Sequence, residues 1–322
     1  MPKGVAVFDL DNTLGDLSSI DYFSNIYDVE SILRSSSISE KNKQIIKENY
    51  NSYPREIKDF LLELRDTYEK NLDMYGYTEL ILRKDVEKIM NPLVNAIDDM
   101  SLAGCIIYSN NGNPYTLEFT GRAFERYYER KDIFFAYLER TNPLRNEFDE
   151  NPTGARKKTV ATIQKVTKEL RNISDVEPSD IIFFDDLIHP DLIEKGVTYI
   201  NVKPYNSIIH QHKLNEMFAL FEDTLYELFA KYKNMGAKFF ELFHIKKLLG
   251  VTSVEQMEEQ YLIHSRESYR RHFVSDYPEI KDKLDTYLES IKKYASQNAG
   301  RKRKSSTRRR TRRSKKKNRT RY

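Results

Sequence analysis

The most constraining feature of the sequence is a series of short apolar runs that mostly end at acidic or small polar residues. Four such runs occupy residues 4–10, 104–110, 180–186 and 197–202. Their content of β-branched and aromatic residues predicts short buried strands. Segments with helical spacing, such as 158–170, separate the runs. Strands that alternate with helices predict an α/β fold with a parallel, doubly wound sheet.

The run at 4–10 leads into the segment Asp9-Leu10-Asp11-Asn12-Thr13. In an extended chain, Asp9 and Asp11 lie on the same side because side chains repeat every second residue. Two carboxylates so close need a counter-cation, and Mg²⁺ is the natural candidate because it prefers carboxylate and phosphate oxygens. One carboxylate can attack phosphorus, while the other protonates the leaving oxygen and later activates water.

Three further groups follow in the order that such chemistry requires. Ser109 follows the apolar residues CIIY of the second run and can donate a hydrogen bond to a phosphoryl oxygen. Lys157 or Lys158, of which we favour Lys158, opens the next helix and can neutralise phosphate. Asp185 and Asp186 end the third run and can bind the metal. Ligands bind beyond the carboxyl ends of parallel strands, so these groups should meet there.

The motifs VFDLDNT, IIYSNN, the lysine of RKK and FFDDLIHPD together resemble the four motifs of the haloacid dehalogenase (HAD) superfamily. The resemblance covers residues 4–14 and 104–203. Within the superfamily, FFDDLIHPDLIEKGVTYINV is most similar to the small magnesium-dependent phosphatases. The resemblance implies a HAD-like Rossmannoid sheet and a hydrolase that acts on phosphomonoesters through an aspartyl phosphate.

The resemblance also implies roles for the matched residues. Asp9 would be the nucleophile and a metal ligand. Asp11 would be the general acid and base, with its backbone carbonyl on the metal, and Thr13 would support the nucleophile loop. The candidate catalytic residues are Asp9, Asp11, Thr13, Ser109, Asn110 and Lys158. The candidate metal ligands are Asp9, Asp11, Asp185 and Asp186.

The pattern divides the chain into four parts. Residues 1–14 and 101–206 form the expected HAD-like core, and residues 15–100 form a helical cap inserted into it. Residues 207–298 form a helical extension, and residues 299–322 a disordered basic tail.

The stretch 113–156 is long and rich in Tyr, Phe and Arg, which suggests an insertion that contacts the substrate. Within it, Arg122, Arg126 and Arg130 share helical spacing. We interpret these arginines as a solvated basic face.

The basic charge of the protein is concentrated at its C-terminal end. Residues 301–322 hold 14 of the 53 Lys and Arg residues, which leaves 39 against 49 acidic residues in an acidic body. The tail could be a nuclear address, a nonspecific contact to nucleic acid or a packaging tail, and its composition resembles basic C-termini of large DNA virus proteins. The sequence shows neither a membrane-spanning stretch nor a secretory signal, so we expect an intracellular protein.

The leading hypothesis is a magnesium-dependent phosphomonoester hydrolase. A cap that closes over the site favours a small phosphorylated substrate. One alternative is a phosphatase that acts on nucleic-acid ends or phosphoprotein. Another is a non-catalytic, nucleic-acid-associated or scaffold protein with a remnant HAD core.

Overall fold

The computed structural model describes residues 2–17, 19–21, 23, 33, 39–52, 55–149, 156–205, 211–232 and 275–296. At the centre of the fold is a five-stranded sheet with the strand order β3-β2-β1-β4-β5, in which every neighbouring pair is parallel. The strands are β1 (Gly4–Phe8), β2 (Leu102–Tyr108), β3 (Phe134–Leu138), β4 (Ile181–Asp185) and β5 (Thr198–Asn201). The predicted α/β fold with a parallel sheet is therefore confirmed.

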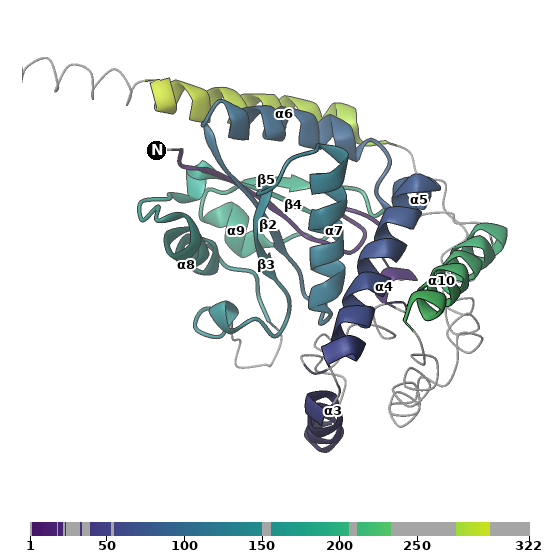
Figure 1. Cartoon of the computed structure of the whole chain (residues 1–322). Helices are drawn as coiled ribbons and strands as arrows, with labels where there is room; N and C mark the ends of the chain where they lie inside the picture. The colour runs from purple at the N-terminus through teal and green to yellow at the C-terminus, as the bar shows by residue number, and fades with distance from the viewer. Residues whose placement is uncertain are drawn as a thin grey trace, which may run out of the picture.

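Helices cover both faces of the sheet, as Figure 1 shows. Alternate residues of β1 point to opposite faces, so Ala6 and Phe8 join one apolar cluster while Val5 and Val7 join the other. The first cluster includes apolar residues of α4 (Arg55–Met74), α5 (Tyr77–Ile81), α6 (Val86–Asp98), α7 (Pro114–Tyr127) and α10 (Gln211–Lys231). The second includes residues of α8 (Val160–Arg171) and α9 (Pro190–Glu194). Cys105 is buried in the first cluster.

The chain between β1 and β2 is largely helical and includes α3 (Glu40–Ser52), α4, α5 and α6. Helix α6 packs against β2, and its buried residues belong to the same apolar cluster as those of α4. Helix α4 in turn packs against α10, where Tyr68 donates to the Met217 carbonyl at 3.2 Å. The inserted helices thus share one hydrophobic core with the sheet. The domain boundaries given above stay predictions.

The stretch 113–156 supplies core elements, namely α7, β3 and the short 3₁₀ helix η1 (Pro143–Arg145). The prediction that the arginines of this stretch form a solvated basic face is wrong. Arg122 and Arg126 are about three-quarters buried and pair with Glu69 of α4 at 2.8 and 2.6 Å. These ion pairs link α7 to α4.

The C-terminal part of the predicted extension returns to the sheet as a helix over residues 277–296. Tyr287 accepts a hydrogen bond from Val5 N at 3.1 Å and donates to the Asp180 carbonyl at 2.6 Å. Just before this helix, Asp276 forms a buried ion pair with Arg83. The helix is therefore an integral part of the core. The predicted basic tail lies outside the described residues.

Within the described residues, none of the helices is both long and apolar enough to cross a membrane.

Candidate active site

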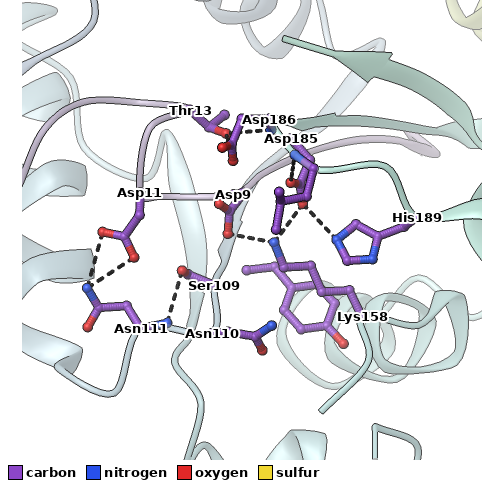
Figure 2. A network of polar contacts seen from close by, with 12 residues as sticks. Asp9, Asp11, Thr13, Ser109, Asn110, Asn111, Lys158, Asp185, Asp186 and His189 are labelled. Carbon is purple, nitrogen blue, oxygen red and sulfur yellow. Dashed lines mark hydrogen bonds and ion pairs between the residues drawn. The ribbon is translucent and has the colours of Figure 1, made fainter. Parts of the chain in front are cut away.

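The carboxyl ends of three neighbouring strands carry most of the residues singled out in the sequence (Figure 2). Asp9 directly follows β1, Ser109 directly follows β2, and Asp185 is the last residue of β4. Because β1 lies between β2 and β4, these side chains converge on one edge of the sheet. Lys158 reaches the same place from the chain that leads into α8.

Lys158 is the buried cation of this site. Its Nζ lies 2.5 Å from Asp9 Oδ1 and 2.7 Å from Asp185 Oδ2. The residue is only 4% exposed. Lys157, the alternative considered above, is instead exposed and pairs with Asp191 at 3.0 Å. The structure therefore places Lys158, and not Lys157, beside Asp9.

Asp9, Asp185 and Asp186 form a carboxylate cluster. Each offers an oxygen atom, and these three atoms all lie within 4.8 Å of one another. Lys158 supplies one positive charge against three carboxylates, which leaves an excess of negative charge in a largely buried site. Hard divalent cations prefer such carboxylate oxygens. The cluster therefore fits a metal ion such as Mg²⁺.

Burial and charge act differently on the three carboxylates. Burial raises the pKa of Asp9, an effect that Lys158 opposes and Asp185 reinforces. Burial likewise raises the pKa of Asp186, and the charges of Asp9 and Asp185 add to it. For Asp185, burial is outweighed by His189 and Lys158, so its pKa is lowered. Asp185 is thus the carboxylate that the protein itself holds most firmly as an anion.

The Asp11 carboxylate lies apart from this cluster. Asn111 Nδ2 donates to both of its oxygens, each at 3.3 Å. Burial, together with the charges of Asp21 and Asp9, raises the pKa of Asp11 to about 7. A carboxyl group that titrates near neutral pH can both give and take a proton. Any contribution of Asp11 to a metal would come through its backbone carbonyl, as the resemblance implies.

The turn after β1 has a fixed shape. Asn12 has a φ of 58°, in the left-handed region that asparagine enters more readily than most residues. Gly15 passes so close to Ile81 that a Cβ would lie 2.5 Å from the Ile81 carbonyl oxygen. Thr13 Oγ1 accepts a hydrogen bond from Asp186 N at 3.1 Å. Thr13 therefore ties the turn after β1 to the turn after β4.

Ser109 and Asn110 follow β2 and have different surroundings. Ser109 is 1% exposed, and its Oγ accepts a hydrogen bond from Asn111 N at 3.1 Å. Because this oxygen acts as an acceptor here, its hydrogen can be donated to a phosphoryl oxygen. Asn110 is exposed, and its Oδ1 accepts from Arg145 Nη2 at 2.8 Å. Its side chain is therefore engaged with Arg145 and lies at the rim of the site.

Asn111 and His189 are among the residues that contact the site and that sequence reasoning missed. Asn111 holds Asp11, and its position next to Ser109 and Asn110 in the motif SNN was the only signal for it. His189 Nε2 lies 3.2 Å from Asp185 Oδ2. Its spacing of four residues from Asp185 at a strand end could have drawn attention to it. Each of these residues lies close to a carboxylate of the site.

Comparisons with known proteins give distant matches only. No protein-family model matches the chain, and no curated protein sequence does. A solved structure of a proposed phosphatase from Clostridium difficile is 18% identical, with a TM-score of 0.29, over 67% of this chain and 92% of that one. A proposed haloacid dehalogenase-like hydrolase from Bacteroides fragilis is 17% identical, with a TM-score of 0.27, over 67% of this chain and 93% of that one. Matches at this level of similarity do not assign a function to the chain.

Proposed function

We propose that the protein is a magnesium-dependent phosphomonoester hydrolase that acts through an aspartyl phosphate on Asp9. The observation that carries this proposal is the buried contact of 2.5 Å between Lys158 Nζ and Asp9 Oδ1 at the carboxyl end of the central strand. An ionised carboxylate beside a cation can act as a nucleophile toward an electrophilic phosphorus. The likeness of the four motifs to those of HAD phosphatases gives independent support.

The reaction would proceed in two displacements. In the first, an Asp9 oxygen forms a bond to phosphorus, the bond from phosphorus to the ester oxygen breaks, and Asp11 protonates the departing oxygen. In the second, Asp11 takes a proton from water, the water oxygen attacks phosphorus, and inorganic phosphate leaves Asp9 as a carboxylate. Asp11 returns to its starting state because it loses one proton and regains one.

The surrounding residues would bind and orient the phosphoryl group. Ser109 would donate its hydroxyl hydrogen to a phosphoryl oxygen, and Lys158 would stabilise the negative charge that develops there. Asp9, Asp185 and Asp186 would hold Mg²⁺, with the Asp11 carbonyl as a further ligand. When bound, the cation supplies Lewis-acid stabilisation of the phosphoryl oxygens and offsets the repulsion between phosphate and the carboxylates.

The substrate class follows from the inserted helices and from the tail. A segment of some 85 residues inserted between β1 and β2 favours a small phosphorylated molecule over a folded phosphoprotein. The basic residues at 301–322 favour a second, separate property, which is weak binding of nucleic acid without sequence preference. A phosphatase that acts on nucleic-acid ends would combine phosphoester hydrolysis with nucleic-acid binding, and it is the second candidate function. A remnant, non-catalytic core is disfavoured because Asp9, Lys158 and the Asp185-Asp186 pair are all in place.

Hydrolysis of an aryl phosphate by the purified full-length protein tests the proposal. We expect turnover that requires Mg²⁺, is lost in EDTA and is abolished by Asp9→Asn. Asp66→Asn is the matched control, because Asp66 is an exposed carboxylate of α4 that pairs with the neighbouring Arg65. Wild-type turnover by Asp9→Asn would mean that the nucleophile lies elsewhere.

A further inference from the structure

Arg145 and Asp149 form a fully buried ion pair beside the candidate active site. Both side chains are 0% exposed, and Arg145 Nε lies 2.6 Å from Asp149 Oδ2. Taking two charges out of water is costly unless their remaining polar atoms are also satisfied. The further hydrogen-bond partners of Arg145 and Asp149 therefore show which segments this ion pair holds in place.

The Arg145 guanidinium holds the chain at the end of β2. Its Nη1 donates to the carbonyl oxygens of Ser109 and Leu138, the latter at 3.4 Å. Its Nη2 donates to Asn110 Oδ1 at 2.8 Å. The guanidinium also lies 4.7 Å from the ring centroid of Tyr108. Arg145 thus fixes both the backbone and one side chain of the turn that presents Ser109.

Asp149 contacts the chain on both sides of Lys158 through its carboxylate and its backbone carbonyl. Its Oδ1 accepts hydrogen bonds from Thr159 Oγ1 at 3.1 Å and Thr162 Oγ1 at 2.6 Å. Its backbone carbonyl accepts from Lys157 N at 3.1 Å. Thr159 is the N-cap of α8, so these contacts also fix where that helix begins. The position of Lys158 between Lys157 and Thr159 is therefore set by Asp149.

Tyr108 closes the network from the strand side. Its hydroxyl donates to Asp149 Oδ2 at 2.6 Å and accepts from Thr159 N at 3.0 Å. Burial, together with the nearby charge of Asp149, raises the pKa of Tyr108. The hydroxyl therefore stays protonated and remains a donor at neutral pH. A continuous set of contacts runs from the turn at Ser109 to the start of α8.

We propose that Arg145 and Asp149 are positioning residues that fix the positions of Ser109 and Lys158 relative to each other for phosphoryl transfer. The inference rests on the proposed function and deepens it. Ser109 and Lys158 come from segments 49 positions apart in the sequence. In the proposed reaction, both side chains must nevertheless contact the same phosphoryl group. A misplacement of about 1 Å can cost on the order of 100-fold in rate, so a rigid link between the two segments has a direct catalytic benefit.

The test compares Asp149→Asn with Asp276→Asn. An amide at position 149 cannot accept on both sides, so either the two threonine hydroxyls or the Arg145 and Tyr108 donors lose their acceptor. Asp276 is a matched control because it is also a buried carboxylate, paired with an arginine and accepting from Lys203 N at 2.6 Å. Thr162→Val is a milder second variant that removes a single hydroxyl from Asp149.

Two readouts are measured on the full-length proteins. The first is kcat and KM for an aryl phosphate in Mg²⁺. We expect kcat to fall about 10- to 100-fold in Asp149→Asn, and less in Thr162→Val, while Asp276→Asn keeps the wild-type kcat even if its Tm falls. The second is amide hydrogen exchange followed by mass spectrometry, which does not depend on turnover. Exchange should rise in peptides covering 107–113 and 156–163 in Asp149→Asn and stay unchanged there in Asp276→Asn.

The outcomes separate this inference from the proposed function. A wild-type protein without turnover would overturn the hydrolase proposal, whereas the exchange data would still report on the link between the two segments. The positioning role is refuted if exchange in both peptides is the same in Asp149→Asn and the wild type. It is also refuted if Asp149→Asn lowers Tm but keeps kcat, because the pair would then be structural only.

Discussion

Replacing Lys158 by methionine removes the cation from the carboxylate cluster and keeps an unbranched side chain of similar length. Lys158 Nζ contacts Asp9 Oδ1 at 2.5 Å and Asp185 Oδ2 at 2.7 Å, and the residue is 4% exposed. Breaking a buried ion pair by removing one partner costs about 3–5 kcal/mol because a buried charge is left uncompensated. We expect a loss of this size in the free energy of unfolding, measured with urea at neutral pH in EDTA.

A second substitution tests whether uncompensated charge causes this loss. In Lys158→Met combined with Asp9→Asn, one of the two stranded carboxylates is gone. The double variant should therefore be more stable than the sum of the single effects predicts, by about 0.5–3 kcal/mol. Strict additivity of the two substitutions would refute the electrostatic reasoning. In Mg²⁺, kcat of Lys158→Met should fall about 10²- to 10³-fold, as expected for the loss of a group that stabilises charge in the transition state.

Three further predictions concern other parts of the molecule. Asp11→Asn should slow hydrolysis about 10²- to 10⁴-fold for an ester with a poor leaving group and less for one with a good leaving group. Equal losses for both esters would contradict a general acid at this position. Burial tends to raise the pKa of Glu69, but Arg122 and Arg126 outweigh it, so its pKa is lowered in the folded protein. The stability that ionised Glu69 contributes is therefore present above its unfolded pKa of about 4.3 and is lost as pH falls through the folded pKa. The difference in Tm between the wild type and Glu69→Gln should accordingly shrink in acid, and a constant difference from neutral to acidic pH would be inconsistent with the ion pair. Deletion of residues 301–322 should abolish salt-sensitive binding to DNA and leave turnover of a small phosphoester unchanged, whereas tight DNA binding by the truncated protein would show that the acidic body takes part.

Four of the five strands could be predicted from the sequence, including β5, whose run at 197–202 leads into no candidate site residue. The runs that became β1, β2 and β4 are continuous and apolar, and each leads directly into polar residues that lie at one edge of the sheet. Strand β3 was missed. Its residues lie within the stretch 113–156, which the sequence analysis interpreted as an insertion that contacts the substrate.

Contacts between distant segments could not be predicted in the same way. Arg122 and Arg126 look like an exposed face because their partner Glu69 lies 53 and 57 positions away in the sequence. Arg145 likewise has no local sign of burial, since its contact with Ser109 spans 36 positions. Helical spacing shows which residues share a face but not what that face packs against. Only the packed fold reveals that these charges are paired.

The most direct test of the proposed function is to trap the covalent intermediate. The full-length protein is mixed with Mg²⁺ and an aryl phosphate, quenched in acid within the first turnover and digested for mass spectrometry. We predict one phosphoryl group on the peptide that contains Asp9 and no such product in Asp9→Asn. Turnover of the ester by the wild type with a phosphoryl group on another residue, or with none on any residue at any quench time, would contradict an aspartyl phosphate at Asp9.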